Sequence, residues 1–383
     1  MKTIAIICLT PFYKEPRVLR TVQALKPYYN LIIFSDGSSF EGFNSINIAK
    51  FNLDYEFVYS KNKLIAKFQS VLLKLKYENF PSVSYFKKKF WHYRVGALKL
   101  IQMNKFDLVI AHGIYALPFI SALNCKKVFN AHEYYLRELE DNSTWLKYTR
   151  PYYNYILNNH LRNCDLVFAV NKPIGEEYEK TYGIKYLEIT NATDFVDLKP
   201  KAVTTEISII HHGAAIRNRQ LELMIKCVNL LPDNYTLTLM LVKTDEVYYN
   251  ELLKYKSSRI KFIEPVDVRL ISKSINQFDI GLFILPPVNY NWLNALPNKL
   301  FEFIQGRLAI AVSPNPLMKQ VVNENQIGIV AHDYSAEAMA TSITSLSIEQ
   351  IMDYKINADL IAKKLNGGIT AERIKKSVDT LLN

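Results

Sequence analysis

The chain has 383 residues, enough for two or three domains of ordinary size. Hydrophobic residues make up 49% of it and charged residues 22%, which allows full apolar cores and excludes a disordered chain. The net charge of +11 favours acidic partners, namely nucleotide phosphates, nucleic acid or anionic lipid headgroups, although compositional drift toward Lys explains the same excess equally well.

The cysteines and the apolar runs indicate whether the chain is expected to bind zinc, form disulfides, be secreted or span a membrane. The four cysteines are far apart and form no C-x-x-C pair, so neither a zinc site nor a disulfide framework is expected. The apolar run at the N-terminus is only about six residues long, shorter than a secretory signal core. No stretch approaches the roughly 18 apolar residues that span a bilayer. We therefore expect a cytoplasmic protein that touches a membrane, if at all, peripherally from its cytoplasmic face.

The first half alternates short apolar runs with helical patterns. Continuous apolar runs bounded by polar or turn residues are typical of buried parallel strands. Such runs lie at 3–9, 30–36, 55–60, 107–113, 127–133, 165–171 and 186–190. Helical patterns lie between them, for example at 16–27 and 93–104. This βαβ alternation predicts a doubly wound sheet.

The same alternation restarts after residue 200. Strand-like runs lie at 207–213, 236–242, 261–266, 279–285, 308–312 and 327–331, and helical patterns at 217–230 and 350–382. The predicted fold class is therefore α/β, with two Rossmann-like doubly wound domains facing each other across a cleft. The predicted parts are a first domain at 1–195, a linker at 196–206, a second domain at 207–365, and a C-terminal helix at 366–383 that could pack back on the first domain.

A glycine and two arginines follow the first strand of the second half. Ligands of open α/β sheets bind beyond the carboxyl ends of the strands, which is where Gly213 stands. A glycine lets the backbone approach a ligand, and the N-terminus of the helix predicted at 217–230 suits a phosphate. Arg217 and Arg219 add positive charge there. A turn with two solvated arginines is the alternative interpretation.

The most specific signal is the segment NALPNKLFEFIQGRLAIAVSPNP at 294–316. Asn294 precedes the predicted helix and Asn298 begins it, and asparagine amides both cap helices and bind sugar hydroxyls. Lys299 and Glu302 stand three residues apart and so share roughly one helix face. A lysine in the first turn opposes the helix dipole, which a bound anion would offset, and a glutamate can accept two hydrogen bonds from a ribose diol. A surface ion pair is the alternative.

Polar groups also follow three strands of the first half. His112 ends one predicted strand, and His132 with Glu133 ends the next; hydrogen-bonded core histidines are the alternative to a ligand site. Arg17 and Arg20 follow the first strand. They would either meet an anionic or hydroxylated ligand or be solvated at a helix end.

A basic and aromatic segment, YFKKKFWHYR at 85–94, lies in the first half. It contains Lys87, Lys88, Lys89, Trp91 and Arg94. This composition suits an anionic membrane surface or single-stranded nucleic acid, and a solvated pair of amphipathic helices has the same composition. The chain has no D-x-D pair, so no metal ion is expected at a nucleotide diphosphate.

Seven segments together resemble the GT-B glycosyltransferases, and most of all the large retaining group called glycosyltransferase family 4. The segments are KEPRVLRTVQAL (14–25), NAHEYYLRELE (130–140), CDLVFAVNKPIGEEYEKTYG (164–183), ITNATD (189–194), HHGAAIRNRQLELMI (211–225), FDIGLFIL (278–285) and LPNKLFEFIQGRLAIAVSPNP (296–316). They run over nearly the whole chain in the family's order, and the last segment is the most specific.

The resemblance implies a nucleotide-sugar donor site built mainly from the second domain. Its donor-binding residues would be Gly213, Arg217, Arg219, Asn294, Asn298, Lys299, Leu300 and Glu302. Glu302 matches the residue that holds the ribose hydroxyls, and Lys299 with Arg217 or Arg219 matches those that neutralise the diphosphate. His132 falls where many members place a histidine against the donor sugar, so the implied catalytic residues are His132, Lys299 and Arg217. The family generally needs neither metal nor cofactor, and we slightly prefer a UDP-sugar over a GDP-sugar as the donor.

The chain departs from the family pattern in two places. Many members carry two glutamates with seven residues between them, and the first of these falls on Asn294, whose amide cannot supply a carboxylate's charge. The glycine-rich turn that is common after the first strand is replaced by TPFYKEPR. The identity of the donor sugar therefore stays open.

On this basis we expect transfer of a sugar to a glycan or lipid-linked glycan acceptor in bacterial surface polysaccharide synthesis, with retention of configuration and without a metal. The acceptor or an anionic membrane surface would meet Arg17, His112, Glu133, Lys87, Lys88, Lys89, Trp91 and Arg94, and nucleic acid is not an expected partner. Two alternatives remain. One is a nucleotide-sugar 2-epimerase, which would need a carboxylate-rich cleft, and the other is a nucleic-acid-binding protein, suggested by the net charge.

Overall fold

The computed structural model describes residues 1–37, 41–51, 64–65, 94–121 and 123–383. They form two compact units, one of Met1–Ile189 with Ala371–Asn383 and one of Thr190–Thr370. The change from the first unit to the second falls a few residues before the linker predicted at 196–206. Residues 194–206 form no helix or strand, and they belong to the second unit.

The first unit is built on a parallel sheet whose described strands run in the order β3-β2-β1-β4-β5-β6-β7. The strands are β1 (Thr3–Cys8), β2 (Asn30–Ser35), β3 (Ser45–Asn47), β4 (Leu108–His112), β5 (Lys126–Ala131), β6 (Leu166–Ala169) and β7 (Tyr186–Glu188). The helices are α1 (Pro16–Leu25), α4 (Val95–Gln102), α5 (Leu117–Ile120), α6 (Ser143–Tyr148), α7 (Arg150–His160), α8 (Lys172–Tyr182) and α17 (Gly367–Leu382). Because β1 pairs with both β2 and β4, the strand order reverses there, and such a switch point is where open sheets bind ligands.

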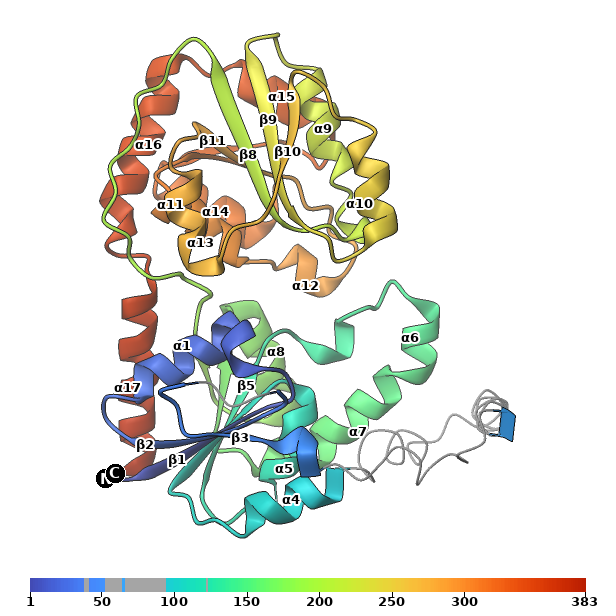
Figure 1. Ribbon diagram of the computed structural model, residues 1–383, viewed down its shortest axis with the longest axis vertical. Helices are drawn as coiled ribbons and strands as arrows, with labels where there is room; N and C mark the ends of the chain where they lie inside the picture. Colours follow the sequence, from blue (N-terminus) through green and yellow to red (C-terminus); the bar gives the residue numbers. More distant parts are fainter. Residues whose placement is uncertain (38–40, 52–63, 66–93, 122) are drawn as a thin grey trace. The chain divides into compact units, whose positions relative to one another are not determined.

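Both ends of the chain lie in the first unit (Figure 1). Ile374 and Val378 of α17 are buried in the same apolar core as the side chains of β1 and α1. At the end of α17, the backbone carbonyl oxygen of Leu382 accepts a hydrogen bond from Nζ of Lys2. From Ala371 on, the C-terminal helix therefore completes the core of the first unit, although its first residues, Gly367–Thr370, belong to the second unit.

The second unit is built on a parallel sheet of order β10-β9-β8-β11-β12-β13. The strands are β8 (Ile207–Ala214), β9 (Tyr235–Val242), β10 (Ile260–Ile263), β11 (Ile280–Phe283), β12 (Ala309–Val312) and β13 (Gly328–Val330). The helices are α9 (Glu222–Asn229), α10 (Glu246–Leu253), α11 (Ile271–Ile275), α12 (Tyr290–Leu293), α13 (Asn298–Gln305), α14 (Pro316–Glu324), α15 (Ala336–Thr344) and α16 (Ile348–Ala362).

Helices cover both faces of this second sheet (Figure 1). Side chains alternate along a strand, so Ile209 of β8 packs in one core with α9, α10 and α15, while Ile210 packs in the other with α13 and α14. Strands buried on both faces are apolar throughout, which is why the sequence shows them as continuous runs.

Helix α13 lies directly against the sheet. Its residues Leu300, Phe301 and Phe303 are each at most 2% exposed. A side chain at Gly281 of β11 would place its Cβ 2.5 Å from Cγ of Phe303, so the glycine makes the room that the phenylalanine ring occupies. The close approach fixes the height of α13 above the sheet and, with it, the position of the polar residues on the same helix.

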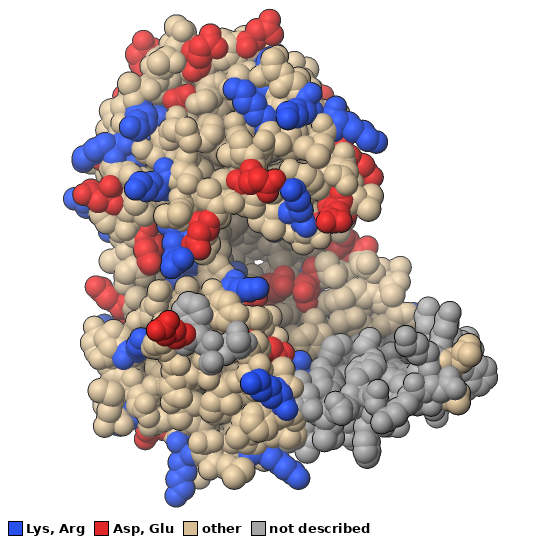
Figure 2. Space-filling model, viewed as in Figure 1, with Lys and Arg blue, Asp and Glu red and all other residues tan. Residues whose placement is uncertain are grey.

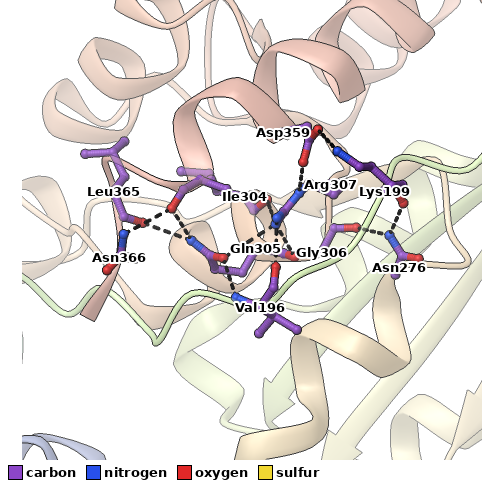
Figure 3. A network of polar contacts seen from close by, with 11 residues as sticks. Val196, Lys199, Asn276, Ile304, Gln305, Gly306, Arg307, Asp359, Leu365 and Asn366 are labelled. Atoms are coloured by element: carbon purple, nitrogen blue, oxygen red, sulfur yellow. Dashed lines mark hydrogen bonds and ion pairs between the residues drawn. The ribbon is translucent and has the colours of Figure 1, made fainter. Parts of the chain in front are cut away.

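A polar network holds the C-terminal end of α13 (Figure 3). Arg307 is fully buried, and its guanidinium donates to Oδ1 of Asp359 at 2.6 Å, to the carbonyl of Gln305 at 2.6 Å and to the carbonyl of Val196 at 2.8 Å. The side chain of Gln305 in turn donates to the carbonyl of Ala362 at 2.8 Å. These bonds tie α13 to α16 and to the segment that enters the second unit.

The two Rossmann-like domains and the α/β class predicted from the sequence are confirmed. Most predicted strands are present, with ends that differ by a few residues. Strand β3 was not predicted, because its three residues SIN carry no apolar run. The strand predicted at 55–60 lies outside the described residues. The cleft between the domains stays a prediction.

The charge of the second unit is mixed on the face that Figure 2 draws. Lys and Arg side chains are interspersed there with Asp and Glu side chains. The net charge of +11 is therefore not gathered into a single basic patch among the described residues on that face. This arrangement is typical of a solvated surface rather than of a nucleic-acid track.

Candidate functional site

The site in the second unit lies where strand β8 ends and helix α13 begins. Strand β8 carries His211, His212 and Gly213 at its carboxyl end, and α13 carries Lys299 and Glu302 in its first turns. The side chains of Lys299 and Glu302 are both buried, with exposed fractions of 7% and 5%. The surface ion pair that the sequence allowed is thereby wrong, and a buried polar site takes its place.

Lys299 has a buried amine with polar and aromatic neighbours. Its Nζ lies 3.2 Å from Nε2 of His211 and 3.8 Å from the ring centre of Phe283. The negative face of the phenylalanine ring attracts a cation at this distance. Burial nevertheless lowers the pKa of Lys299 well below its usual range, helped by the nearby charge of Arg219, whereas Glu302 acts in the opposite direction. The amine is therefore held in a place where its positive charge lacks full compensation.

Glu302 faces a histidine that is neutral. Its Oε2 lies 3.4 Å from Nε2 of His212, within the distance of an ion pair. Burial, with a smaller effect of Lys299, lowers the pKa of His212 to about 3, so the contact is not between two charges near neutral pH. The geometry also falls short of a hydrogen bond, and Nε2 of His212 has no hydrogen-bond partner among the described residues. An unpaired buried nitrogen beside a carboxylate is suited to a ligand that bridges the two.

Gly213 makes the space between two cations. Its φ of +131° lies in the region that favours glycine, and a Cβ built on it would lie 3.5 Å from Nζ of Lys299 and 3.7 Å from Nη1 of Arg219. Burial lowers the pKa of Arg219, whose Nη1 also lies 3.4 Å from the carbonyl oxygen of Ala214. Two cations converging on an open stretch of backbone form a place for an anion with several oxygens.

Arg217 lies elsewhere, and the helix predicted at 217–230 is wrong at its start. Arg217 and Arg219 belong to a short 3-10 turn, Gln220 follows with a left-handed φ of 50°, and α9 begins only at Glu222. The Arg217 side chain is half exposed, donates to Oε2 of Glu251 at 2.7 Å and lies over the ring of Tyr248. Of the two arginines that the sequence proposed for a phosphate, the structure brings Arg219 to Lys299.

The asparagines near α13 have local structural roles. Asn289 caps α12 by accepting a hydrogen bond from the backbone N–H of Trp292 at 2.9 Å, and its Nδ2 is buried without a partner among the described residues. Asn294 follows α12 as its C-cap, is 9% exposed, and donates to the carbonyl oxygen of Tyr290 at 3.0 Å. Asn298 is the first residue of α13 and is partly exposed.

Leu300, which the resemblance included among the donor-binding residues, has an exposed fraction of 1%. Its side chain packs in the apolar core beneath α13 rather than among the polar groups of the site. It therefore acts on the site by holding the helix in place.

The first unit contains a pocket of ≈ 270 Å³ at the carboxyl ends of its strands. Its lining includes His112, His132 and Glu133, three residues that the sequence singled out. Nδ1 of His112 lies 3.5 Å from Nε2 of His132, and Arg17 donates to the backbone carbonyl of His132 at 2.6 Å. Burial lowers the pKa of His112 to about 3 and that of His132 well below its usual range, with Arg17 adding to both effects. Both histidines are therefore neutral near neutral pH.

Glu138 belongs to this pocket, and the sequence did not point to it. Its carboxyl group hydrogen-bonds that of Glu133, and burial, with the charge of Glu138 as a second cause, raises the pKa of Glu133 to about 8. Tyr153 lies beside Glu138 in the lining. The five-residue spacing of the two glutamates is not a helix or strand period, so only the 3-10 turn at Tyr135–Arg137 between them reveals that they meet.

Most of the predicted basic and aromatic segment lies outside the described residues. This applies to Lys87, Lys88, Lys89 and Trp91. Arg94 is described, and its Nη2 lies 3.6 Å from Oδ2 of Asp36. Within the described ranges, no helix is both long and apolar enough to cross a bilayer.

Metal-ligating side chains are not grouped in the part of the chain that the structure describes. No three residues of His, Cys, Asp or Glu stand there in an arrangement that could hold a metal ion. All four cysteines are free thiols, and Cys8 and Cys227 are buried in the apolar cores.

Three solved structures show how the two sheets relate to known folds. A sucrose-phosphate synthase from Thermosynechococcus elongatus aligns with a TM-score of 0.68 at 14% identity, over 100% of this chain and 99% of its own. Anabaena Alr3699/HepE in complex with UDP and glucose aligns with a TM-score of 0.67 at 13% identity, over 99% of this chain and 100% of its own. WaaG, a glycosyltransferase involved in lipopolysaccharide biosynthesis, aligns at 0.64 and 11% identity over 99% of each chain. The chain has the GT-B fold.

A match in sequence supports the same class. Residues 58–197 match the model of the family described as Glycosyltransferase Family 4. A search of curated proteins gave no match. The fold is that of the GT-B glycosyltransferases, and part of the chain matches a glycosyltransferase family model, in agreement with the resemblance of its sequence segments.

Proposed function

We propose that this GT-B chain transfers a sugar from a nucleotide-sugar donor, and that its second unit binds the donor's diphosphate at Lys299, Arg219 and the backbone of Gly213. One observation carries the proposal: the buried amine of Lys299 and the guanidinium of the partly buried Arg219 converge on a glycine at the end of strand β8, each within 4 Å of where its Cβ would be. Two phosphate groups would supply the negative charge that this cluster lacks and accept its N–H donors.

Glu302 and His212 suit the ribose of the same nucleotide. A carboxylate can accept hydrogen bonds from both hydroxyls of a vicinal diol, and the unpaired Nε2 of His212 beside it offers one further polar contact. The donor sugar would then meet the asparagine-rich turn that contains Asn294. Because that amide already donates to the carbonyl oxygen of Tyr290, its hydrogen bond to the turn competes with any contact to sugar hydroxyls.

The arrangement also suits the chemistry of transfer. Breaking the bond between the anomeric carbon and the diphosphate leaves negative charge on the phosphate oxygens, and fixed cations stabilise that charge where it develops. Our proposal keeps retention of configuration and independence of metal ions, since the sequence has no D-x-D pair and Lys299 with Arg219 can take over charge neutralisation. UDP is the nucleotide that we slightly prefer, and the HepE structure similar to this chain is a complex with UDP and glucose.

For the acceptor we propose a glycan or lipid-linked glycan, bound at the pocket of the first unit. The pocket offers neutral histidines, carboxyl groups and tyrosine rings, which suit uncharged hydroxyl groups better than phosphates. WaaG acts in lipopolysaccharide biosynthesis, and synthesis of a bacterial surface polysaccharide at the cytoplasmic face of the membrane is the setting that we propose here.

The test of the donor site is a melting-temperature screen of the full chain against UDP-, GDP-, CMP- and dTDP-sugars. A ligand that binds only the folded protein at a hundred times its Kd stabilises it by about 2.7 kcal/mol, so one nucleotide class should raise Tm clearly. No shift with any of the four would contradict the proposal. Isomerisation of a nucleotide-sugar in the absence of any acceptor would instead indicate a 2-epimerase.

Peripheral membrane binding is tested separately by pelleting the chain with vesicles that contain anionic phospholipid. We expect the protein in the pellet at low salt and in the supernatant at high salt, because surface electrostatics are screened. Protein that stays in the supernatant at low salt would contradict this part of the proposal.

A further inference from the structure

His211 holds Lys299 in a defined way. One ring nitrogen of His211, Nδ1, lies 2.9 Å from the carbonyl oxygen of Leu282 on the neighbouring strand. Since a carbonyl oxygen only accepts hydrogen bonds, Nδ1 carries the proton. The other nitrogen, Nε2, keeps its lone pair and accepts from Nζ of Lys299 at 3.2 Å. The sheet thus fixes the tautomer of a fully buried histidine, and the histidine aims the amine.

The charges that face Lys299 do not balance. Strand β8 presents His211 and His212, both neutral because burial lowers the pKa of each. The 3-10 turn before α9 adds the cation of Arg219, and α13 itself adds the carboxylate of Glu302. With the amine charged, two cations would share one carboxylate in a site with little access to water.

The charged side chains of the other elements packed against α13 either pair with groups other than Lys299 or are exposed. On α16, Lys355 pairs with Asp279 at 3.3 Å, and Asp359 pairs with Arg307 at 2.6 Å. The basic residue of α11, Lys273, is exposed, and β12 has the apolar sequence AIAV. The charge state of Lys299 is therefore decided by the groups at the end of β8.

From this geometry we propose that His211 is the positioning residue of Lys299, and that the aimed amine takes up one proton from solvent when a diphosphate binds beside it. The inference rests on the proposed donor site. Without a ligand, the neutral amine donates to Nε2 of His211 and avoids a second buried cation next to Arg219. A diphosphate reverses the balance, so the ammonium forms, keeps its bond to His211 and directs its other N–H groups to phosphate oxygens.

Proton uptake is measured directly by calorimetric titration of the full chain with UDP at about pH 8 in two buffers of different ionisation enthalpy. We expect an uptake approaching one proton per UDP for the wild type. The variant Lys299→Arg keeps a charge that cannot be removed, so it should bind UDP without this uptake. Wild-type affinity should also fall as pH rises, whereas the affinity of Lys299→Arg should stay level over the same range.

Two substitutions separate the two hydrogen bonds of His211. In His211→Asn the short amide can replace Nδ1 and donate to Leu282, but it offers no acceptor to Lys299. In His211→Gln the longer side chain can place its carbonyl oxygen near Nε2 and accept from the amine. Loss of one net hydrogen bond predicts UDP binding about five-fold weaker in His211→Asn, with His211→Gln close to the wild type.

The outcomes distinguish this inference from the proposed function. UDP binding with equal proton uptake in the wild type and Lys299→Arg, or with none in either, would overturn the inference and leave the donor site standing. Folded His211→Asn protein with wild-type affinity and proton uptake would overturn the positioning role. Failure of UDP to bind the wild type at all would remove the donor site as proposed for UDP, and the inference with it.

Discussion

Replacing Lys299 by methionine should stabilise the second unit while weakening donor binding. The side chain is 7% exposed, and burial and Arg219 both work against its charge. At neutral pH the folded protein holds this amine either without its proton or as a poorly compensated cation. Each unit by which its pKa is lowered costs about 1.4 kcal/mol, which an apolar side chain of similar volume avoids. Against this, Nε2 of His211 loses its donor, which costs about 1 kcal/mol or somewhat more. We expect a net gain of about 1–2 kcal/mol, and each kcal/mol raises Tm by about 2–4 °C in a unit of this size.

The stability difference between Lys299→Met and the wild type should also depend on pH. A base with a lowered folded pKa binds fewer protons in the folded than in the unfolded protein, so the stability of the wild type rises with pH up to the ordinary pKa of lysine. The advantage of Lys299→Met should therefore be largest near neutral pH and shrink toward about pH 10. Urea unfolding at pH 7 and at about pH 10 measures this difference in stability. The control is Lys355→Met, which also replaces a buried lysine but removes the partner of Asp279 and should therefore lose stability. A Lys299→Met protein less stable than the wild type at pH 7 would refute the reasoning.

Three further changes test other parts of the structure. Gly213→Ala should lose about 1–3 kcal/mol, since φ is +131° there, and should block the anion between Lys299 and Arg219; unchanged UDP affinity in calorimetry would contradict this. Arg307→Ala should destabilise the second unit by about 3 kcal/mol or more, because Asp359 and buried carbonyls lose their donor, and a wild-type urea midpoint would argue against the network. Burial raises the pKa of Glu133 in the folded protein to about 8, so its contribution to stability falls as the pH rises from the ordinary pKa of a glutamate toward 8. Glu133→Gln should therefore make the stability of the first unit less dependent on pH between about 5 and 8. An unaltered dependence of stability on pH would count against the raised pKa.

The fold was largely predictable because its strands are buried on both faces. Such strands appear as continuous apolar runs, and their alternation with helices gives the α/β class directly. The start of the helix predicted at 217–230 was wrong for a physical reason. Gln220 adopts a left-handed conformation at φ 50°, and a glutamine there gives no sequence signal comparable to a glycine. The turn separates Arg217 from Arg219 and decides which of them meets Lys299.

The candidate site was predictable in part. The sequence indicated Lys299 and Glu302 as site residues because they stand in the first turns of a helix that follows a strand. In the structure both side chains are buried at the start of α13. Their partners His211 and His212 escaped notice as functional groups, because they stand inside an apolar strand and reach α13 only through the fold. Leu300 and Asn294 stay predictions, since a motif assigns a role to a position without showing which way its side chain points or what already binds it.

The central claim, a donor diphosphate site formed by Lys299 and Arg219, is tested most directly by titrating UDP into three proteins in one calorimeter. These are the wild type, Arg219→Ala, and Arg217→Ala as the matched arginine that instead binds Glu251. A charged hydrogen bond to phosphate contributes about 1.5–3 kcal/mol, so Arg219→Ala should bind UDP roughly ten-fold to a hundred-fold more weakly. Arg217→Ala should bind like the wild type. Equal weakening in both variants, or a loss confined to Arg217→Ala, would contradict the site described here.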